Sequence, residues 1–251
     1  MKIYCFGDSF IEHPNEDDDK YWQLILQRHF KDYEYENFGR GGTGSIYSMQ
    51  HFIEQIEKDR LKENDIVVFH LSYMARDYDP KGTTGEEGRP WDQALRESYL
   101  DQINGATHII QNNCFFCSYL YHMCQIIKFK LILFAVDITL NFEEKFGGIK
   151  SGELFFNKML ELNDDYFHLS KINLFQESQK ELLDSQWDEW LENQQRKYFN
   201  DRRVNHFSDD NHKIMAEYII NVIEKKELPS FKTNYKTTND LFFPRVDYIY
   251  D

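Results

Sequence analysis

The sequence predicts an α/β fold in which a parallel sheet of about five strands is covered by helices on both faces. Strand-like and helix-like segments alternate along the 251 residues, as they do when crossover helices join parallel strands. The run DIVVFHL, residues 65–71, is almost continuously apolar, which is typical of a central strand buried on both faces. Clusters of Gly, Asp, Ser and Thr directly follow several strand-like runs and mark where these strands end.

Short apolar and aromatic runs place the strands, and apolar residues at helical spacing place the helices. The expected strands are residues 3–6, 35–38, 67–71 and 131–136, with a fifth within 166–175. Helices are expected over residues 22–30, 46–56, about 92–127 and 177–195, and from Asp209 onward with Ser208 as the cap.

We expect residues 1–227 to form one domain and residues 228–251 to form a tail that packs on this domain or on a partner. The polar stretch 77–91 contains Gly82, Gly85 and Gly88. A loop of this length is either a lid that selects the substrate or a surface insertion without a role.

Composition limits the classes of partner. The 41% hydrophobic content is enough for a packed core, and the net charge of −14 argues against a nucleic-acid partner or an anionic membrane surface. No secretion signal is recognised, and charged residues interrupt the apolar region 114–140, so no membrane span is expected. The expected location is cytoplasmic, or the chain is virus-encoded.

Three cysteines lie close together at Cys114, Cys117 and Cys124, with His122 among them. They fall within one helical run, where buried cysteines behave as small apolar residues. Because no second cysteine pair completes a zinc site, we expect a core role, with no metal and no cofactor.

Two segments with candidate site residues follow the first two expected strands. CFGDSF, residues 5–10, puts Ser9 at a strand exit, where it is either a turn residue or a nucleophile. ENFGRGGTGS, residues 36–45, is a glycine loop whose backbone N–H groups lie at a helix start. The carboxyl ends of parallel strands meet at one edge of the sheet, so these segments should converge. Gly41, Thr43 and Arg76, which follows the central strand, are the candidate substrate-binding residues.

The third segment is VNHFSDDNHKIMAEYII, residues 204–220. A serine hydrolase needs an imidazole that accepts the hydroxyl proton and returns it to the leaving group. His206 precedes the last helix and lies in a loop, where its ring can be aimed. His212 lies one turn inside this helix, on its apolar face, and reads more simply as a half-buried histidine.

Together these segments resemble the SGNH/GDSL hydrolase family. GDSF matches the family's nucleophile block, NFGRGGTG its glycine block and HFSDDNHKIMAEYI its closing block. The resemblance implies a three-layer α/β/α flavodoxin-like fold and a serine esterase. It makes Ser9 the nucleophile, His206 the base, and the N–H groups of Ser9 and Gly42 the oxyanion donors. In an alternative register, Asp209 and His212 form the pair.

Two positions depart from the family pattern. Met74 or Ala75 stands where the family has an oxyanion-binding Asn, and Arg203 stands where an Asp normally precedes the His. Loss of one oxyanion donor costs on the order of 100-fold in rate. Asp201 or Asp209 would then orient His206, or a Ser–His dyad would operate.

Three functions follow from these observations. The first is a serine esterase that acts on small acyl esters, including O-acetyl groups on carbohydrate. The second is a degenerate member of the fold with a binding or structural role, which is the alternative that the two departures favour. The third is a nucleotide-binding module, which the lack of a phosphate-loop lysine argues against. The expected partner is a small-molecule or carbohydrate ester, and the sequence gives no oligomeric state.

Overall fold

The computed structural model describes residues 1–8, 10–12, 21–41, 43–71, 103–135, 150–172 and 209–229. The chain divides into two compact units. The first joins Met1–His13 to Tyr33–Asn173 and contains the whole sheet, and the second joins Pro14–Asp32 to Leu174–Asp251.

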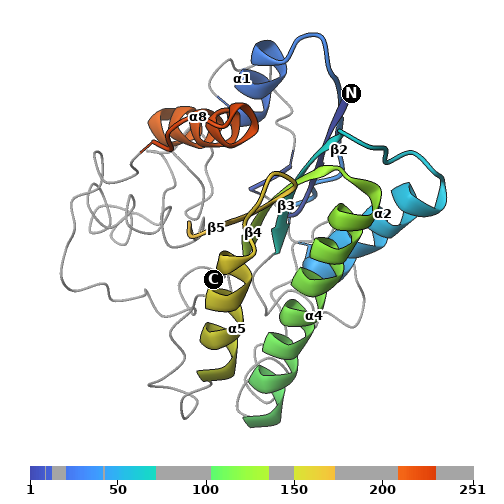
Figure 1. The fold of residues 1–251 in the computed structure, drawn as a ribbon, viewed down its shortest axis with the longest axis vertical. Helices are drawn as coiled ribbons and strands as arrows, with labels where there is room; N and C mark the ends of the chain where they lie inside the picture. The colour runs from blue at the N-terminus through green and yellow to red at the C-terminus, as the bar shows by residue number, and fades with distance from the viewer. Residues whose placement is uncertain are drawn as a thin grey trace, which may run out of the picture. The chain divides into compact units, whose positions relative to one another are not determined.

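The first unit is built on a sheet of five strands that are all parallel to their neighbours (Figure 1). The strands are β1 Lys2–Phe6, β2 Glu34–Asn37, β3 Ile66–Leu71, β4 Lys130–Ala135 and β5 Phe167–Ser170. Their order is β2-β1-β3-β4-β5, which is the flavodoxin-like doubly wound order. The predicted α/β class with a parallel sheet of about five strands is therefore confirmed. Each predicted strand is present, although β5 occupies only four residues of its predicted range.

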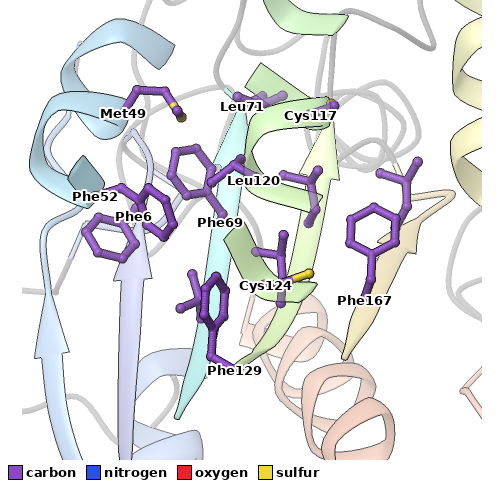
Figure 2. Close-up of a cluster of buried hydrophobic side chains, with 14 of the residues drawn as sticks. Phe6, Met49, Phe52, Phe69, Leu71, Cys117, Leu120, Cys124, Phe129 and Phe167 are labelled. Carbon is purple, nitrogen blue, oxygen red and sulfur yellow. The ribbon is translucent and has the colours of Figure 1, made fainter. Parts of the chain in front are cut away.

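Three helices cover one face of this sheet: α2 Ser45–Glu57, α4 Ile103–Ile127 and α5 Lys150–Glu161. Helix α2 lies over β1 and β3, α4 lies over β4 and β5, and α5 packs against α4 and β5. Since side chains alternate along a strand, every second residue of β3 enters this layer. Figure 2 shows Phe69 and Leu71 of β3 beside Phe52 of α2 and Leu120 of α4.

The opposite face of the central strands is buried as well. Ile66, Val68 and His70 alternate with the residues of the helix-covered face, and each is at most 3% exposed. This burial on both sides explains why β3 reads as an unbroken apolar run. His70 is the exception in that run, because it is an ionisable residue at a fully buried position.

Helix α5 is an element that the sequence analysis did not predict. Its segment, KSGELFFNKMLE, has apolar residues at helical spacing. Phe156 and Met159 are buried, and Phe155 and Leu160 are partly buried against the core. This pattern, together with the crossover element that a parallel connection between β4 and β5 needs, would have located the helix.

In the second unit, α1 Trp22–His29 lies against α8 Asp209–Glu224. Trp22 and Leu26 of α1 and Met215 and Ile219 of α8 are fully buried, as the predicted apolar stripes require. His29 Nε2 lies 2.8 Å from Glu224 Oε1 at the end of α8. This contact, followed by that of Lys226, lowers the pKa of the Glu224 carboxyl.

Two of the three cysteines on α4 lie in the core, as predicted, and Cys114 is only partly buried. Cys117 and Cys124 are fully buried on α4, and all four cysteines are free thiols. Burial raises the pKa of Cys124 to about 12, so this thiol is an inert apolar group. Among the described helices, none combines the length and the apolarity that a bilayer crossing requires.

Several sequence predictions fall outside the described residues. These are the start of the helix predicted from about residue 92, the helix at 177–195, the insertion at 77–91, the cap Ser208 and residues 230–251 of the tail. The one-domain assignment of residues 1–227 stays a prediction.

Phe52 tests the core. Its ring contacts those of Phe6, Phe69 and Phe129 at centroid distances of 5.6–6.0 Å. We expect Phe52→Ala to lower the free energy of unfolding by about 3–5 kcal/mol, because it leaves a cavity among these rings. The same substitution at Phe115, which is 63% exposed, should cost less than about 1 kcal/mol. Urea unfolding measures both, and equal losses would contradict this account of the core.

His168 on β5 gives a prediction for acid stability. Burial, with a smaller contribution from Lys130, lowers the pKa of His168 from 6.5 to about 4. Between these pH values the unfolded chain binds a proton that the folded chain does not, so stability falls as the pH drops from 6.5 to 4. Relative to His168→Gln, the natural chain should lose up to about 1.4 kcal/mol per pH unit in this window. Parallel stability curves for the two proteins over pH 4–7 would refute the assignment.

Candidate active site

The structure describes half of the predicted site residues. Ser9, Gly42, Arg76 and His206 lie outside the described residues, so their roles stay predictions. Gly41, Thr43 and His212 are described, and Asp209 is the first residue of α8. The site can therefore be built from the residues on either side of Ser9 and Gly42.

The chain turns sharply after β1, and Asp8 holds this turn. Its backbone carbonyl accepts hydrogen bonds from the N–H groups of Ile11 and Glu12, both at 2.9 Å. Its carboxylate Oδ1 accepts a third from the N–H of Phe10 at 3.0 Å. A side-chain acceptor two residues before the N–H group it binds is the geometry of a helix cap. Asp8 thus fixes the backbone directly after Ser9.

A second partner reaches the same carboxylate oxygen from the central strand. His70 Nδ1 lies 3.0 Å from Asp8 Oδ1, and the two side chains are only 1% and 2% exposed. The ring of Phe10 packs edge-on against the His70 ring at a centroid distance of 5.6 Å. Asp8 and His70 therefore form a buried polar pair that joins the exit of β1 to the end of β3.

The glycine loop after β2 lies directly on the β1 turn. Asn37 Nδ2 donates to the Ile11 carbonyl at 2.7 Å, and Asn37 Oδ1 accepts from the Gly39 N–H at 2.7 Å. The Arg40 N–H donates to the Gly7 carbonyl at 3.1 Å. One amide side chain and one backbone bond thus hold the two loops together. The predicted convergence of these segments is observed for the described residues.

The close approach of the two loops requires glycine. A Cβ on Gly39 would lie 2.5 Å from the Ile11 carbonyl carbon and 2.6 Å from the Glu12 nitrogen. Both are backbone atoms that have no freedom to rotate away. A Cβ on Gly7 would lie 3.0 Å from the His70 Cβ. These glycines allow the backbones after β1 and β2, and the side chain from β3, to meet.

The loop ends at the start of α2. The Thr43 hydroxyl donates to the Arg40 carbonyl at 2.7 Å and closes the loop on itself. Thr43 is 5% exposed, whereas Gly41 is more exposed. Gly44 is the N-cap of α2, and among the described residues no side chain caps this helix start. Helix starts of this kind favour a negatively charged group.

His212 lies on α8 in the second unit. It is 7% exposed, and its ring packs against Tyr21 at a centroid distance of 4.9 Å. Both registers for the catalytic base remain predictions, because His206 is not described.

Sequence analysis missed three residues that build this region. Asp8 was recognised only as part of a turn cluster, Asn37 only as the start of the glycine block, and His70 only as part of a strand. A signal was present for His70, because it interrupts an apolar run just before that run ends. Within the described residues, no three His, Cys, Asp or Glu side chains gather as a metal site would require.

Comparisons with known proteins relate the chain to solved structures only. No family model matches it, and no curated protein does. An acetyl xylan esterase named AlAXEase is 15% identical, with a TM-score of 0.48 over 89% of this chain and 100% of that chain. The esterase EstA from Pseudoalteromonas sp. is 13% identical, with a TM-score of 0.45 over 89% and 97% of the two chains. A member of the lipolytic protein G-D-S-L family from Veillonella parvula is 12% identical, with a TM-score of 0.48 over 89% and 98%.

Solved structures of GDSL-type hydrolases are thus among those that the chain resembles. Identities of 12–15% and TM-scores below 0.5 describe a broadly similar chain trace and carry no information on activity or substrate. The strand order and the loops after β1 and β2 are what connect this chain to the fold that its motifs predict.

Asn37 tests how the two loops are joined. In Asn37→Asp one carboxylate oxygen would face the Ile11 carbonyl without a hydrogen to donate. We expect a loss of about 1–3 kcal/mol in the free energy of unfolding and faster amide hydrogen exchange at Gly39. Asn163 makes the same kind of paired contact with the backbone of Leu169 in β5. Asn163→Asp should therefore destabilise the chain without a local effect on Gly39. Equal Gly39 exchange in both variants would refute the role of Asn37.

Proposed function

We propose that the chain is a serine esterase that hydrolyses small acyl esters, with Ser9 as its nucleophile. The observation that carries this proposal is the meeting of the GDSF turn and the glycine loop at the exits of β1 and β2. Asp8, Asn37 and Gly39 hold the described parts of both loops in place. In this strand order, the switch point lies between β1 and β3, and ligands bind there at the carboxyl ends of the strands.

The proposed chemistry proceeds in two halves. Ser9 Oγ attacks the ester carbonyl carbon while His206 accepts the hydroxyl proton. The carbonyl oxygen becomes an oxyanion, which the N–H groups of Ser9 and Gly42 stabilise. The C–O bond then breaks, and His206 returns the proton to the leaving alcohol. Water, activated by the same imidazole, releases the acid from the acyl-enzyme and restores Ser9.

The substrate is expected to be a neutral ester, including O-acetyl groups on carbohydrate. A net charge of −14 disfavours an anionic substrate unless a local cation compensates for it. Arg76 is the proposed local cation, since a guanidinium can hold an oxyanion or a carboxylate with two parallel hydrogen bonds. Gly41 and Thr43 are proposed to line the substrate side of the glycine loop. The insertion at 77–91 is proposed as a lid over the site.

A binding role without catalysis is the second proposal. It is favoured by Met74 or Ala75 at the position of the oxyanion-binding Asn and by Arg203 in place of the usual Asp. A chain with these losses would keep the fold and a pocket for the acyl or sugar group. It would not form an acyl-enzyme.

Substitution of Ser9 separates the two proposals. Turnover of a chromogenic acetyl ester should fall at least about 1,000-fold in Ser9→Ala, because the nucleophile is removed. An organophosphate should add one covalent group at Ser9, measured by mass spectrometry. Ser170→Ala, the same change at the carboxyl end of β5, should keep full turnover. Absence of both turnover and labelling in the natural chain would favour the binding role.

The base is assigned by a second pair of variants. His206→Ala should abolish turnover, whereas His212→Ala should keep it and lower stability, because the Tyr21 contact is lost. The reverse result would assign the pair Asp209 and His212 instead.

A further inference from the structure

The pair formed by Asp8 and His70 is a polar contact built into a region that is otherwise apolar. His70 lies on β3 between Phe69 and Leu71, and all three residues are fully buried. Asp8 Oδ1 accepts from His70 Nδ1 and from the Phe10 N–H, each at 3.0 Å. An apolar residue at position 70 would suit the strand better. The position of the imidazole therefore needs a reason beyond packing.

The state of the imidazole follows from its partner. A carboxylate only accepts hydrogen bonds, so Nδ1 is the atom of His70 that carries the proton. Nε2 is buried and has no hydrogen-bond partner among the residues that the structure describes. A buried polar atom left in this way costs stability. His70 therefore makes its hydrogen bond to Asp8 through Nδ1 at the cost of burying Nε2 without a partner among the described residues.

The contact between Asp8 and His70 bears on the direction of the turn after β1. His70 fixes Asp8 Oδ1, which accepts the hydrogen bond from the Phe10 N–H, and the Asp8 carbonyl accepts those from Ile11 and Glu12. Ser9 is the residue between Asp8 and Phe10 in the chain. Without His70, Oδ1 of Asp8 would lose one of the two hydrogen bonds that fix its position, and its bond to the Phe10 N–H would be held less firmly.

We propose that His70 is a positioning residue, which orients the nucleophile turn through Asp8 and touches no substrate. This role rests on the proposed function of Ser9. A nucleophile that is misplaced by about 1 Å loses on the order of 100-fold in rate, while the substrate still binds to its other contacts. Loss of His70 should therefore lower kcat and leave KM nearly unchanged.

The test compares replacements of His70 that keep or remove the donor at Nδ1. In His70→Asn the amide nitrogen stands near the position of Nδ1, so kcat should stay within about fivefold of the natural value. In His70→Leu and His70→Gln, no donor is placed there, and kcat should fall about 10- to 100-fold with KM within about threefold. Amide exchange at Phe10 should become faster in these two variants only. The rescue by Asn distinguishes positioning from a general loss of stability.

His168→Leu is the matched control, because it also replaces a histidine of the sheet that is at least partly buried, on β5 at the far edge of the strand order. It should change stability and leave kcat unchanged. A double-mutant cycle adds a further check. In an Asp8→Asn background, His70→Leu should lower kcat less than it does in the natural chain.

Two results overturn the proposal, and they differ from failure of the proposed function. If Ser9→Ala is inactive but folded His70→Leu has natural kcat, Ser9 is the nucleophile and His70 does not position it. If His70→Asn and His70→Leu lose kcat equally, the donor at Nδ1 is not what matters. If Ser9→Ala keeps its turnover, the proposed function itself is wrong, and the role of His70 falls with it.

Discussion

The buried carboxylate of Asp8 is the constraint on which this end of the sheet depends. A carboxylate that is 2% exposed is costly unless it is hydrogen-bonded, and Asp8 meets this condition through Phe10 and His70. These partners come from different places: one is two residues along the same turn, and the other is on the central strand. The need to satisfy one buried charge therefore couples the local turn to β3. A change in either partner would therefore disturb the turn between Asp8 and Phe10, which contains Ser9 in the sequence.

The glycine loop adds a second constraint of a different kind. Asn37 makes hydrogen bonds to backbone groups on both sides of the junction, while Gly39 supplies the space that brings the backbones together. A larger residue at 39 would push the loop away from Ile11 and break the contacts of Asn37. Space and hydrogen bonding thus act together, and neither alone would hold the loops after β1 and β2 at this distance. The strand order then puts their junction beside the β1–β3 switch point.

Local patterns in the sequence predicted most of the fold. The strand β3 was predictable because burial on both faces makes it a continuous apolar run. Helix α8 was predictable because burial of one face leaves apolar residues at helical spacing. Helix α5 was missed although its apolar residues recur at helical spacing and Phe156 and Met159 are buried. The contact between Asp8 and His70, in contrast, was beyond prediction. It joins residues 62 positions apart, and only the register of β1 and β3 brings them together.

The carboxylate of Asp8, which precedes the proposed nucleophile Ser9 in the sequence, also has an electrostatic consequence for the proposed reaction. Two unit negative charges a few ångströms apart repel by a few kcal/mol at an effective dielectric constant of about 20. An ionised Asp8 beside the proposed oxyanion would oppose catalysis unless its own charge were held by donors. The Phe10 N–H and His70 Nδ1 are donors that hold the charge on Oδ1, and they fix the direction in which the carboxylate points. The imidazole at position 70 thus satisfies the buried carboxylate that shapes the turn. Under the proposed function of Ser9, it also fixes the direction of that carboxylate relative to the oxyanion.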